Sequence, residues 1–312
     1  MKNRWSVAPD AHLPEGGDLP LQQHPAYGAA CRTSGAAATM LALGDPRRPQ
    51  ATALVIHRRW PAIGSVALIS RGPVWAPATQ AEAATVHLAA LLDLLAASHR
   101  AVIVTPERIA GGDPLSDGAA LPMMTPACVA MLPVRPPEAQ RAGLHQKWRN
   151  RLRRAEAKGL ECRAAPMPSD PGHWLLRAEA AQARTRGYSR LPPAFAAAWA
   201  GAAEARLFTA HTHRAPVAGL LFLRHGPWAT YHVGWTSEAG RETGAHNLLM
   251  WQAMLWARAT GLTALDLGAL DTVNAPGLAR FKLGAGAAPH RLGATWLRAP
   301  GTGLVRAIWP RR

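Results

Sequence analysis

The fold of this chain is decided by residues 230–286, which have the sequence TYHVGWTSEAGRETGAHNLLMWQAMLWARATGLTALDLGALDTVNAPGLARFKLGAG. The stretch opens with aromatic and β-branched residues, which are typical of a strand. Small residues at 241–245 then lead into a helix whose apolar side chains cover most of its circumference. Gly261 ends that helix, and residues 262–267 have the pattern of a second strand. This order predicts an α/β unit with a ligand site at one edge of its sheet.

The turn between the first strand and the helix has the composition of an anion-binding site. Small residues let a ligand approach the backbone, and the amide groups and dipole at a helix amino end favour an anion or a developing oxyanion. An acyl donor, on whose carbonyl an oxyanion develops during transfer, suits such a turn, and we predict that it contacts Arg241, Gly244, Ala245 and Asn247. The alternative is a plain connection from strand to helix that binds no ligand.

The acidic loop and short helix after the second strand supply candidate catalytic groups. Asp266 and Asp271 lie near the carboxyl end of that strand, where they can orient an amine or accept its proton. Asp271 can equally be a helix cap or a solvated loop residue. Lys282 follows in the short helix and is expected to aim a cation at the same edge. Tyr231 and His232 complete the catalytic candidates; they alternate faces of their strand, so only one of them can point into a cleft.

A basic helix is predicted for residues 137–158. One side of it is apolar and is expected to pack inward, and the cations fall on two other sides. The apolar side carries Leu144, Trp148, Leu152 and Ala155, the first cationic side Lys147, Arg151, Arg154 and Lys158, and the second Arg149 and Arg153. Like charges one helical turn apart repel, so a bridging anion would account for the array. The alternative is a solvated basic face.

Residues 230–286 resemble the carboxyl-terminal part of the FemAB-type transferases. These are GNAT-superfamily proteins with two GNAT-like domains, and they include the aminoacyltransferases that form peptidoglycan bridges. Three further stretches resemble the family and occur in its order: RGPVW at 71–75, the basic residues 146–160, and ARTRGY at 183–188. The resemblance covers most of the chain from Gly72 onward.

The resemblance implies an α/β chain with mixed sheets, built from two tandem GNAT-like domains at residues 1–160 and 161–312. The second domain would carry the donor-binding and transfer site. The F-K-x-G match implies that Lys282 holds a donor phosphate or the carbonyl oxygen. The family's basic residues further imply that Arg149 and Arg153 bind a substrate phosphate.

Three functions are compatible with these features. The first is FemAB-like transfer of an aminoacyl group from charged tRNA to an amine on a cell-wall precursor. The second is acyl-CoA-dependent N-acyl transfer to a small-molecule, lipid or peptide amine. The third is a non-catalytic protein that binds phosphate or nucleic acid. His246 occupies the last small position of the acetyl-CoA pattern Q/R-x-x-G-x-G/A, which disfavours the second function, and the chain has no long coiled-coil insertion of the kind some bridge-forming members carry.

Charge and composition narrow the partners. The chain has 312 residues, and its 35 Lys and Arg against 19 Asp and Glu give a net charge of +16. This excess favours an anionic partner such as tRNA, a nucleotide-linked precursor or CoA, although arginine use in a GC-rich genome would also produce it. No cofactor is expected to stay bound; the acyl donor would be aminoacyl-tRNA or acyl-CoA.

The remaining composition points to a cytoplasmic protein. No apolar run is long enough to span a bilayer, so at most peripheral membrane contact is expected, and no signal segment opens the chain. The three cysteines are widely spaced, which is typical of reduced thiols. We find no set of ligands with metal-site spacing, no Walker loop and no G-x-S-x-G elbow.

Overall fold

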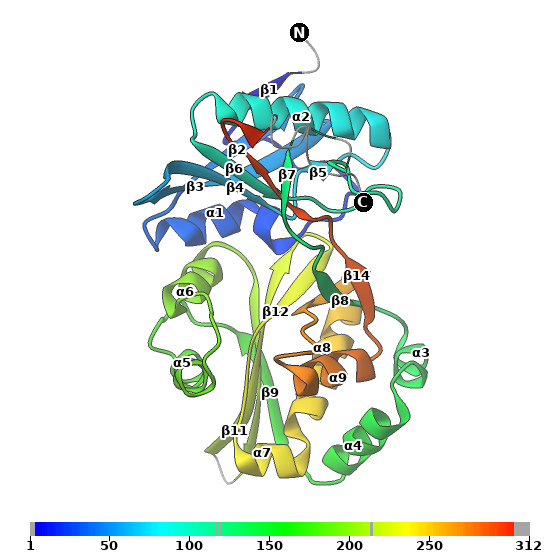
Figure 1. Cartoon of the computed structure of the whole chain (residues 1–312). Helices are drawn as coiled ribbons and strands as arrows, with labels where there is room; N and C mark the ends of the chain where they lie inside the picture. The colour runs from blue at the N-terminus through cyan, green and yellow to red at the C-terminus, as the bar shows by residue number, and fades with distance from the viewer. Residues whose placement is uncertain (1–3, 117, 119, 213–214, 303–312) are drawn as a thin grey trace. The chain divides into compact units, whose positions relative to one another are not determined.

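The computed structural model describes residues 4–302 with the exception of 117, 119, 213 and 214. The chain divides into two units, one made of Cys128–His290 and the other of the residues on either side of that segment. Each unit has its own mixed β-sheet with helices against it (Figure 1). In the described part of the chain, no helix is long and apolar enough to cross a membrane.

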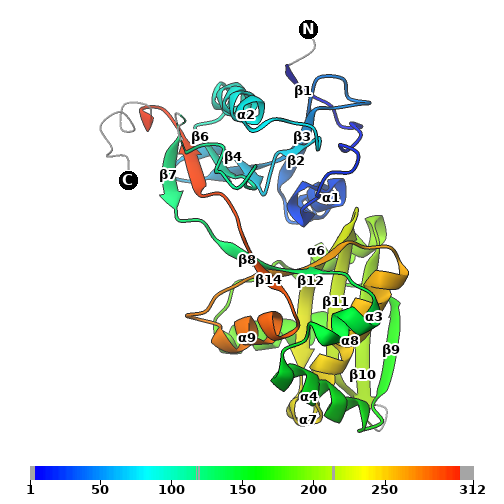
Figure 2. The same cartoon turned by 90° about the vertical axis from the view of Figure 1, so that its right-hand side faces the viewer.

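The first unit is built on a sheet of eight strands with helices on both faces. Figures 1 and 2 show α1 on one face of this sheet and α2 on the other. The strand order is β1-β2-β3-β4-β6-β15-β7, with the short β5 paired to β3. Its strands are β1 (Trp5–Val7), β2 (Ala37–Leu43), β3 (Ala51–Trp60), β4 (Gly64–Ser70), β5 (Val74–Trp75), β6 (Ala101–Thr105), β7 (Leu121–Met124) and β15 (Thr295–Arg298), and its helices are η1 (Leu21–Gln23), α1 (Pro25–Arg32) and α2 (Ala81–Ala96).

The second unit has a sheet of seven strands in the order β14-β8-β13-β12-β11-β10-β9. Helices α5 and α6 lie on one face, and α8 packs on the other with α4 and α9 beside it (Figure 1). Its strands are β8 (Cys128–Pro133), β9 (Glu161–Pro166), β10 (Ala205–Thr212), β11 (Ala215–His225), β12 (Trp228–Thr236), β13 (Ala264–Ala269) and β14 (Ala288–Arg291). Its helices are α3 (Pro137–Ala142), α4 (Gln146–Glu156), α5 (Trp174–Arg186), α6 (Pro193–Ala202), α7 (Glu238–Thr243), α8 (Ala245–Ala259) and α9 (Pro276–Gly284).

The two units repeat one order of elements. In each, a helical segment precedes three antiparallel strands, and a further helix then connects the third strand to a fourth that pairs with it in parallel. The parallel pairs are β4 with β6 around α2, and β12 with β13 around α7 and α8. The sequence prediction of an α/β chain with mixed sheets is confirmed.

Helix α8 is the centre of the second unit's core. Nine of its residues are buried, because one side packs on β10–β13 while α4 covers another. This explains the apolar residues around the whole helix in the sequence. The αL conformation of Gly244, with φ at 72°, separates α8 from the short α7, and Gly261, with φ at 74°, follows the helix end.

The predicted basic helix 137–158 is divided in the structure. Helix α3 ends at Ala142 and α4 begins at Gln146. The predicted inward side is confirmed, since Trp148, Leu152 and Ala155 are the buried residues of α4. The division has a packing reason: the His145 amide donates to the Gly284 carbonyl of α9, 2.9 Å away, and this contact falls in the connection between the helices.

The units divide at other positions than the predicted boundary between residues 160 and 161. Strand β8 pairs with β13, and α4 packs on α8, so both belong with the second sheet. The carboxyl-terminal strand β15 instead pairs with β6 and β7 of the first sheet. These pairings join residues distant in the chain, and no local pattern encodes them.

Candidate functional site

The two parallel strands of the second sheet part before they end. Their pairing stops at Thr230↔Asp266, whereas β12 continues to Thr236 and β13 to Ala269. In the first unit the corresponding strands stay paired up to Ser70↔Thr105, where both end. Ligands of open α/β sheets bind at the carboxyl ends of such strands. The parted ends of β12 and β13 are therefore the candidate site, and the second unit alone has this opening among the described residues.

Lys282 reaches the parted ends from α9. Its Nζ donates to the carbonyl oxygen of Ala269 at 2.7 Å, and the side chain is only 4% exposed. Asp266 is also buried, and its Oδ1 accepts from the amide of Gly268 at 2.7 Å. Burial lowers the pKa of Lys282 to about 8, and the attraction of the Asp266 carboxylate opposes that effect. Lys282 is thus a buried cation at neutral pH, beside a carboxylate, and the structure brings these two predicted residues together.

Tyr231 stands where β12 leaves β13. Its Oη lies 3.1 Å from His246 Nε2, which comes from the first turn of α8. The His246 ring in turn packs edge-on against Phe281, the neighbour of Lys282. A methyl group on Gly234 would lie 1.6 Å from Tyr231 Oη, so the phenol lies directly on that glycine. These contacts fix the position of the Tyr231 hydroxyl.

His232 is the extra residue of a bulge in β12. Leu221 of β11 pairs with Val233 and Phe222 with Tyr231, which leaves His232 unmatched. Its ring packs at 5.5 Å against Phe195 of α6, whereas Tyr231 contacts Phe222 and α8. Burial lowers the pKa of His232 to about 4, so the ring is neutral at pH 7.

A hollow of about 440 Å³ lies beside the amino end of α8, between α4 and α7. Figure 1 shows these two helices next to each other at the lower end of the unit. The lining consists of Lys147, Asn150, Arg151, Arg154, Arg241, Glu242, Thr243 and Gly244. It contains four cations and one carboxylate. The first amides of a helix have no intrahelical partner, so the hollow suits an anion such as a phosphate.

Gly244 is required by the way α4 meets this turn. Its φ of 72° is unfavourable for residues with a side chain. A methyl group there would lie 3.3 Å from the Cβ of Ala155 and 3.3 Å from the Cγ of Arg151. Of the predicted donor-binding residues, Arg241 and Gly244 line the hollow, whereas Ala245 is buried at the start of α8.

Other predicted residues have different surroundings. Arg149 donates from Nη2 to the carbonyls at the end of α3 and just after it, and Arg153 donates to Asn150. Neither lines the hollow. Asp271 holds its own loop, because its Oδ1 accepts from the amides of Val273 and Asn274. The side-chain amide of Asn274, which donates to Asp271 Oδ2 at 2.9 Å, lowers the pKa of Asp271 most, and these backbone bonds lower it further. Asn247 is buried within α8.

The cations that line the hollow were all identified from the sequence. Arg151 and Arg154 fall on the first predicted cationic side of the helix, whereas the phosphate role was placed on the second. His246 was identified only as a departure from a pattern. Glu179 was not identified: it is a buried carboxylate of α5 that accepts from Tyr188 Oη at 3.1 Å. No local signal marks it, because its burial results from the packing of α5 on β12.

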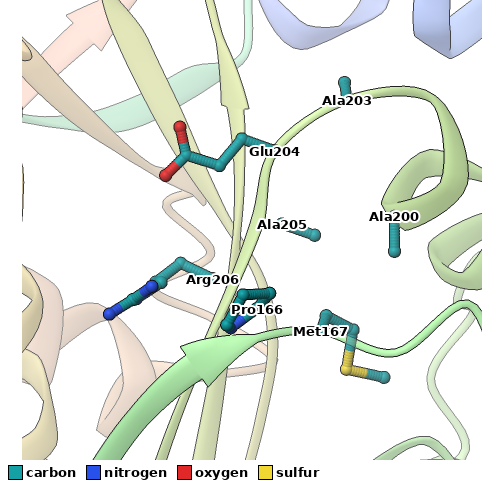
Figure 3. Close-up of a pocket in the computed structure, with 7 residues that line it drawn as sticks. All are labelled: Pro166, Met167, Ala200, Ala203, Glu204, Ala205 and Arg206. Atoms are coloured by element: carbon teal, nitrogen blue, oxygen red, sulfur yellow. The ribbon is translucent and has the colours of Figure 1, made fainter.

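A second hollow, of about 470 Å³, lies between α6 and the strands β9 and β10 (Figure 3). Apolar side chains dominate its lining. Its two charged residues, Glu204 and Arg206, point away from Met167 (Figure 3), and Glu204 pairs with Arg224 at 3.0 Å. This hollow brings no catalytic groups together.

A comparison with protein families matches most of the second unit. Residues 143–290 match the family model described as an acetyltransferase (GNAT) domain. This segment contains the parted strands, Lys282 and the basic hollow. A search of curated proteins gave no match.

Solved structures share the fold across both units. A structure of FemX has a TM-score of 0.76 at 14% identity, with 93% of this chain and 94% of that chain covered. The carboxyl-terminal domain of a putative lysylphosphatidylglycerol synthetase from Agrobacterium fabrum has a TM-score of 0.56 at 11% identity, with 92% of each chain covered. A tandem GNAT protein from the clavulanic acid biosynthesis pathway has a TM-score of 0.52 at 12% identity, with 91% and 90% covered.

Proposed function

Because residues 143–290 match an acetyltransferase (GNAT) domain and the chain shares the fold of FemX and of a tandem GNAT protein, we propose that it is an acyltransferase that transfers an aminoacyl group from charged tRNA to an acceptor amine. The acceptor would be an amine on a cell-wall precursor. The second candidate donor is acyl-CoA, which the match to an acetyltransferase domain favours.

The observation that carries the proposal is the basic hollow. Lys147, Arg151, Arg154 and Arg241 surround the amino end of α8, and none of them forms an ion pair with a carboxylate in the described part of the chain. Cations that exceed the carboxylates at a helix amino end favour a phosphate. Both tRNA and CoA carry phosphates, so the hollow supports either donor.

In the sequence, the bulk of His246 argued against acyl-CoA, because a large side chain would keep a phosphate away from the backbone. The geometry of His246 removes this objection. Its ring turns into the unit, toward Tyr231 and Phe281, and does not line the hollow. The net charge of +16 favours the longer polyanion, because each neutralised phosphate releases counterions. We therefore place tRNA before CoA.

Lys282 would stabilise the transition state of the transfer. The acceptor amine attacks the ester carbonyl of the donor, and negative charge develops on the carbonyl oxygen. A buried, preorganised cation at the parted strand ends stabilises that charge more than a solvated one would. Asp266 would hold Lys282 in its charged form.

The test is acyl transfer by the purified chain. Radiolabelled aminoacyl-tRNA and acyl-CoA are each incubated with a nucleotide-linked cell-wall peptide, and amine-dependent appearance of the amide product is measured. We expect product from aminoacyl-tRNA. Product from acyl-CoA alone would select the second donor, and product from neither would overturn the proposal.

The role of the hollow is tested through the salt dependence of tRNA binding. We expect Arg151→Ala/Arg154→Ala to lower the slope of log K against log salt by roughly 1.5 to 2, about one for each lost phosphate contact. The matched control is Arg177→Ala/Arg258→Ala, which removes two exposed arginines of the same unit that do not line the hollow. Equal slopes for the two double variants would contradict the assignment. The pair Arg149→Ala/Arg153→Ala tests the other predicted phosphate residues.

A further inference from the structure

His246 is a polar side chain whose ring packs among aromatic residues of the second unit, where an apolar residue would pack without unsatisfied polar atoms. It lies in the first turn of α8, two residues after Gly244, and its ring enters the space between Tyr231 and Phe281. Its Nδ1 atom is buried and has no hydrogen-bond partner among the described residues. A buried polar atom without a partner costs about 1–3 kcal/mol, so its presence calls for an explanation.

The hydrogen bond at the other ring nitrogen decides the tautomer. Nε2 lies 3.1 Å from Tyr231 Oη. If Nδ1 carried the proton, a buried N–H would have no acceptor, which is rarer in proteins than a buried acceptor without a donor. The proton is therefore assigned to Nε2, which donates to Tyr231 Oη. The hydroxyl hydrogen of Tyr231 is then directed away from His246.

The Tyr231 hydroxyl is held at the parted strands by neighbours on both sides. Tyr231 follows Thr230, the last residue of β12 that pairs with β13. The phenol packs directly against the backbone of Gly234, since any side chain there would overlap Oη. Phe281 links the His246 ring to the helix that carries Lys282. Tyr231, His246 and Phe281 thus form one packed cluster, and Phe281 is the chain neighbour of Lys282 in α9.

We propose that Tyr231 passes the proton from the attacking amine to the leaving oxygen of an ester donor, and that His246 is the positioning residue that orients its hydroxyl. This inference rests on the proposed acyl transfer from an oxygen ester and adds the residues that move and position the proton during that transfer. It also assigns a role to the histidine that replaces the small residue of the acetyl-CoA pattern.

The step balances within this site. The amine nitrogen forms a bond to the carbonyl carbon, and the bond from that carbon to the ribose oxygen breaks. The ribose oxygen leaves with the electron pair and takes the Tyr231 hydroxyl proton. The phenolate, which accepts from His246 Nε2–H, then takes the proton that the amine nitrogen loses. The products are an amide and a free ribose hydroxyl, and Tyr231 is regenerated.

The acidity of Tyr231 favours an oxygen leaving group over sulfur. Burial, with smaller effects of Tyr188 and Glu179, raises the pKa of Tyr231. A thiolate, whose conjugate acid has a pKa of about 8.5, leaves without such a weak acid to protonate it. A ribose alkoxide is far more basic, so it gains most from a proton donor of this kind.

The experiment compares two leaving groups on one donor. An oligonucleotide with the tRNA acceptor-end sequence is charged with an amino acid through a 3′-ester or a 3′-thioester, and kcat is measured for each. We expect His246→Leu to lower kcat for the ester about 100-fold and for the thioester less than about 3-fold. Tyr231→Phe should give the same pattern, and the double variant should be no worse than either. His246→Gln, whose amide can still donate to Tyr231, should restore most of the ester rate.

A matched control is available in the same unit. His211 of β10 also has a buried Nδ1 without a partner, and its Nε2 lies 3.0 Å from Thr209 Oγ1. We expect His211→Leu to leave the ester-to-thioester ratio unchanged. Equal loss on both donors in His246→Leu, or no rescue by His246→Gln, would overturn the inference. Absence of transfer by the wild-type chain from either donor would instead overturn the proposed function.

Discussion

Replacement of Lys282 by Met tests the electrostatics of the site. The substitution keeps the length and most of the volume of the side chain but removes its charge. Lys282 is 4% exposed, and Met can fill the same apolar space with little repacking. The variant is therefore expected to fold, so that activity and stability can both be measured.

The effect on stability depends on pH in a direction that the structure fixes. Burial lowers the pKa of Lys282 from 10.5 to about 8. The folded state therefore binds fewer protons than the unfolded state between these values, and wild-type stability rises with pH through this window. At about 1.4 kcal/mol for each pH unit, the gain from this side chain is about 3 kcal/mol. Lys282→Met lacks the group and should not show this gain.

The measurement is urea unfolding of both proteins at pH 7 and pH 10.5. Their difference in unfolding free energy should shift by about 3 kcal/mol in favour of the wild type at the higher pH. At pH 7 the variant should also lose about 100- to 1,000-fold in kcat, which is the effect of removing one donor to a developing oxyanion. A stability difference that stays constant with pH would refute the burial argument, and retained turnover would refute the catalytic assignment.

Three further predictions concern packing and acid stability. Gly284→Ala should lower stability by about 1–3 kcal/mol in urea unfolding, because the new methyl group would lie 3.0 Å from Trp148 Cδ1; an unchanged midpoint would show that α4 can shift without cost. Trp199→Ala, which empties a fully buried position, should cost about 3–5 kcal/mol, and a loss below 1 kcal/mol would contradict its burial. Burial lowers the pKa of His24 and of His232 to about 4, so the folded state prefers neutral rings and should lose stability as pH falls from about 6.5 to 4. Thermal unfolding across that range checks this, and His232→Gln should weaken the dependence.

The basic helix shows what the spacing of residues along one helix can and cannot predict. The 3.6-residue spacing of Trp148, Leu152 and Ala155 predicted which side packs inward, and these residues are buried. The same spacing separated two cationic sides. It could not say which of them meets a second element, because the hollow forms only where α4 lies against the turn before α8.

The sequence by itself determined the order of elements from 230 to 286, the glycine turn before the buried helix and the alternation of strands and helices. These features depend on residues within a few turns of one another, so their pattern is local. The tertiary structure alone decided where β12 and β13 part, that Tyr231 rather than His232 meets His246, and that β15 joins the first sheet. The physical reason is that each of these features depends on pairing or burial between segments distant in the chain. The sequence of one segment does not specify which other segment it will contact.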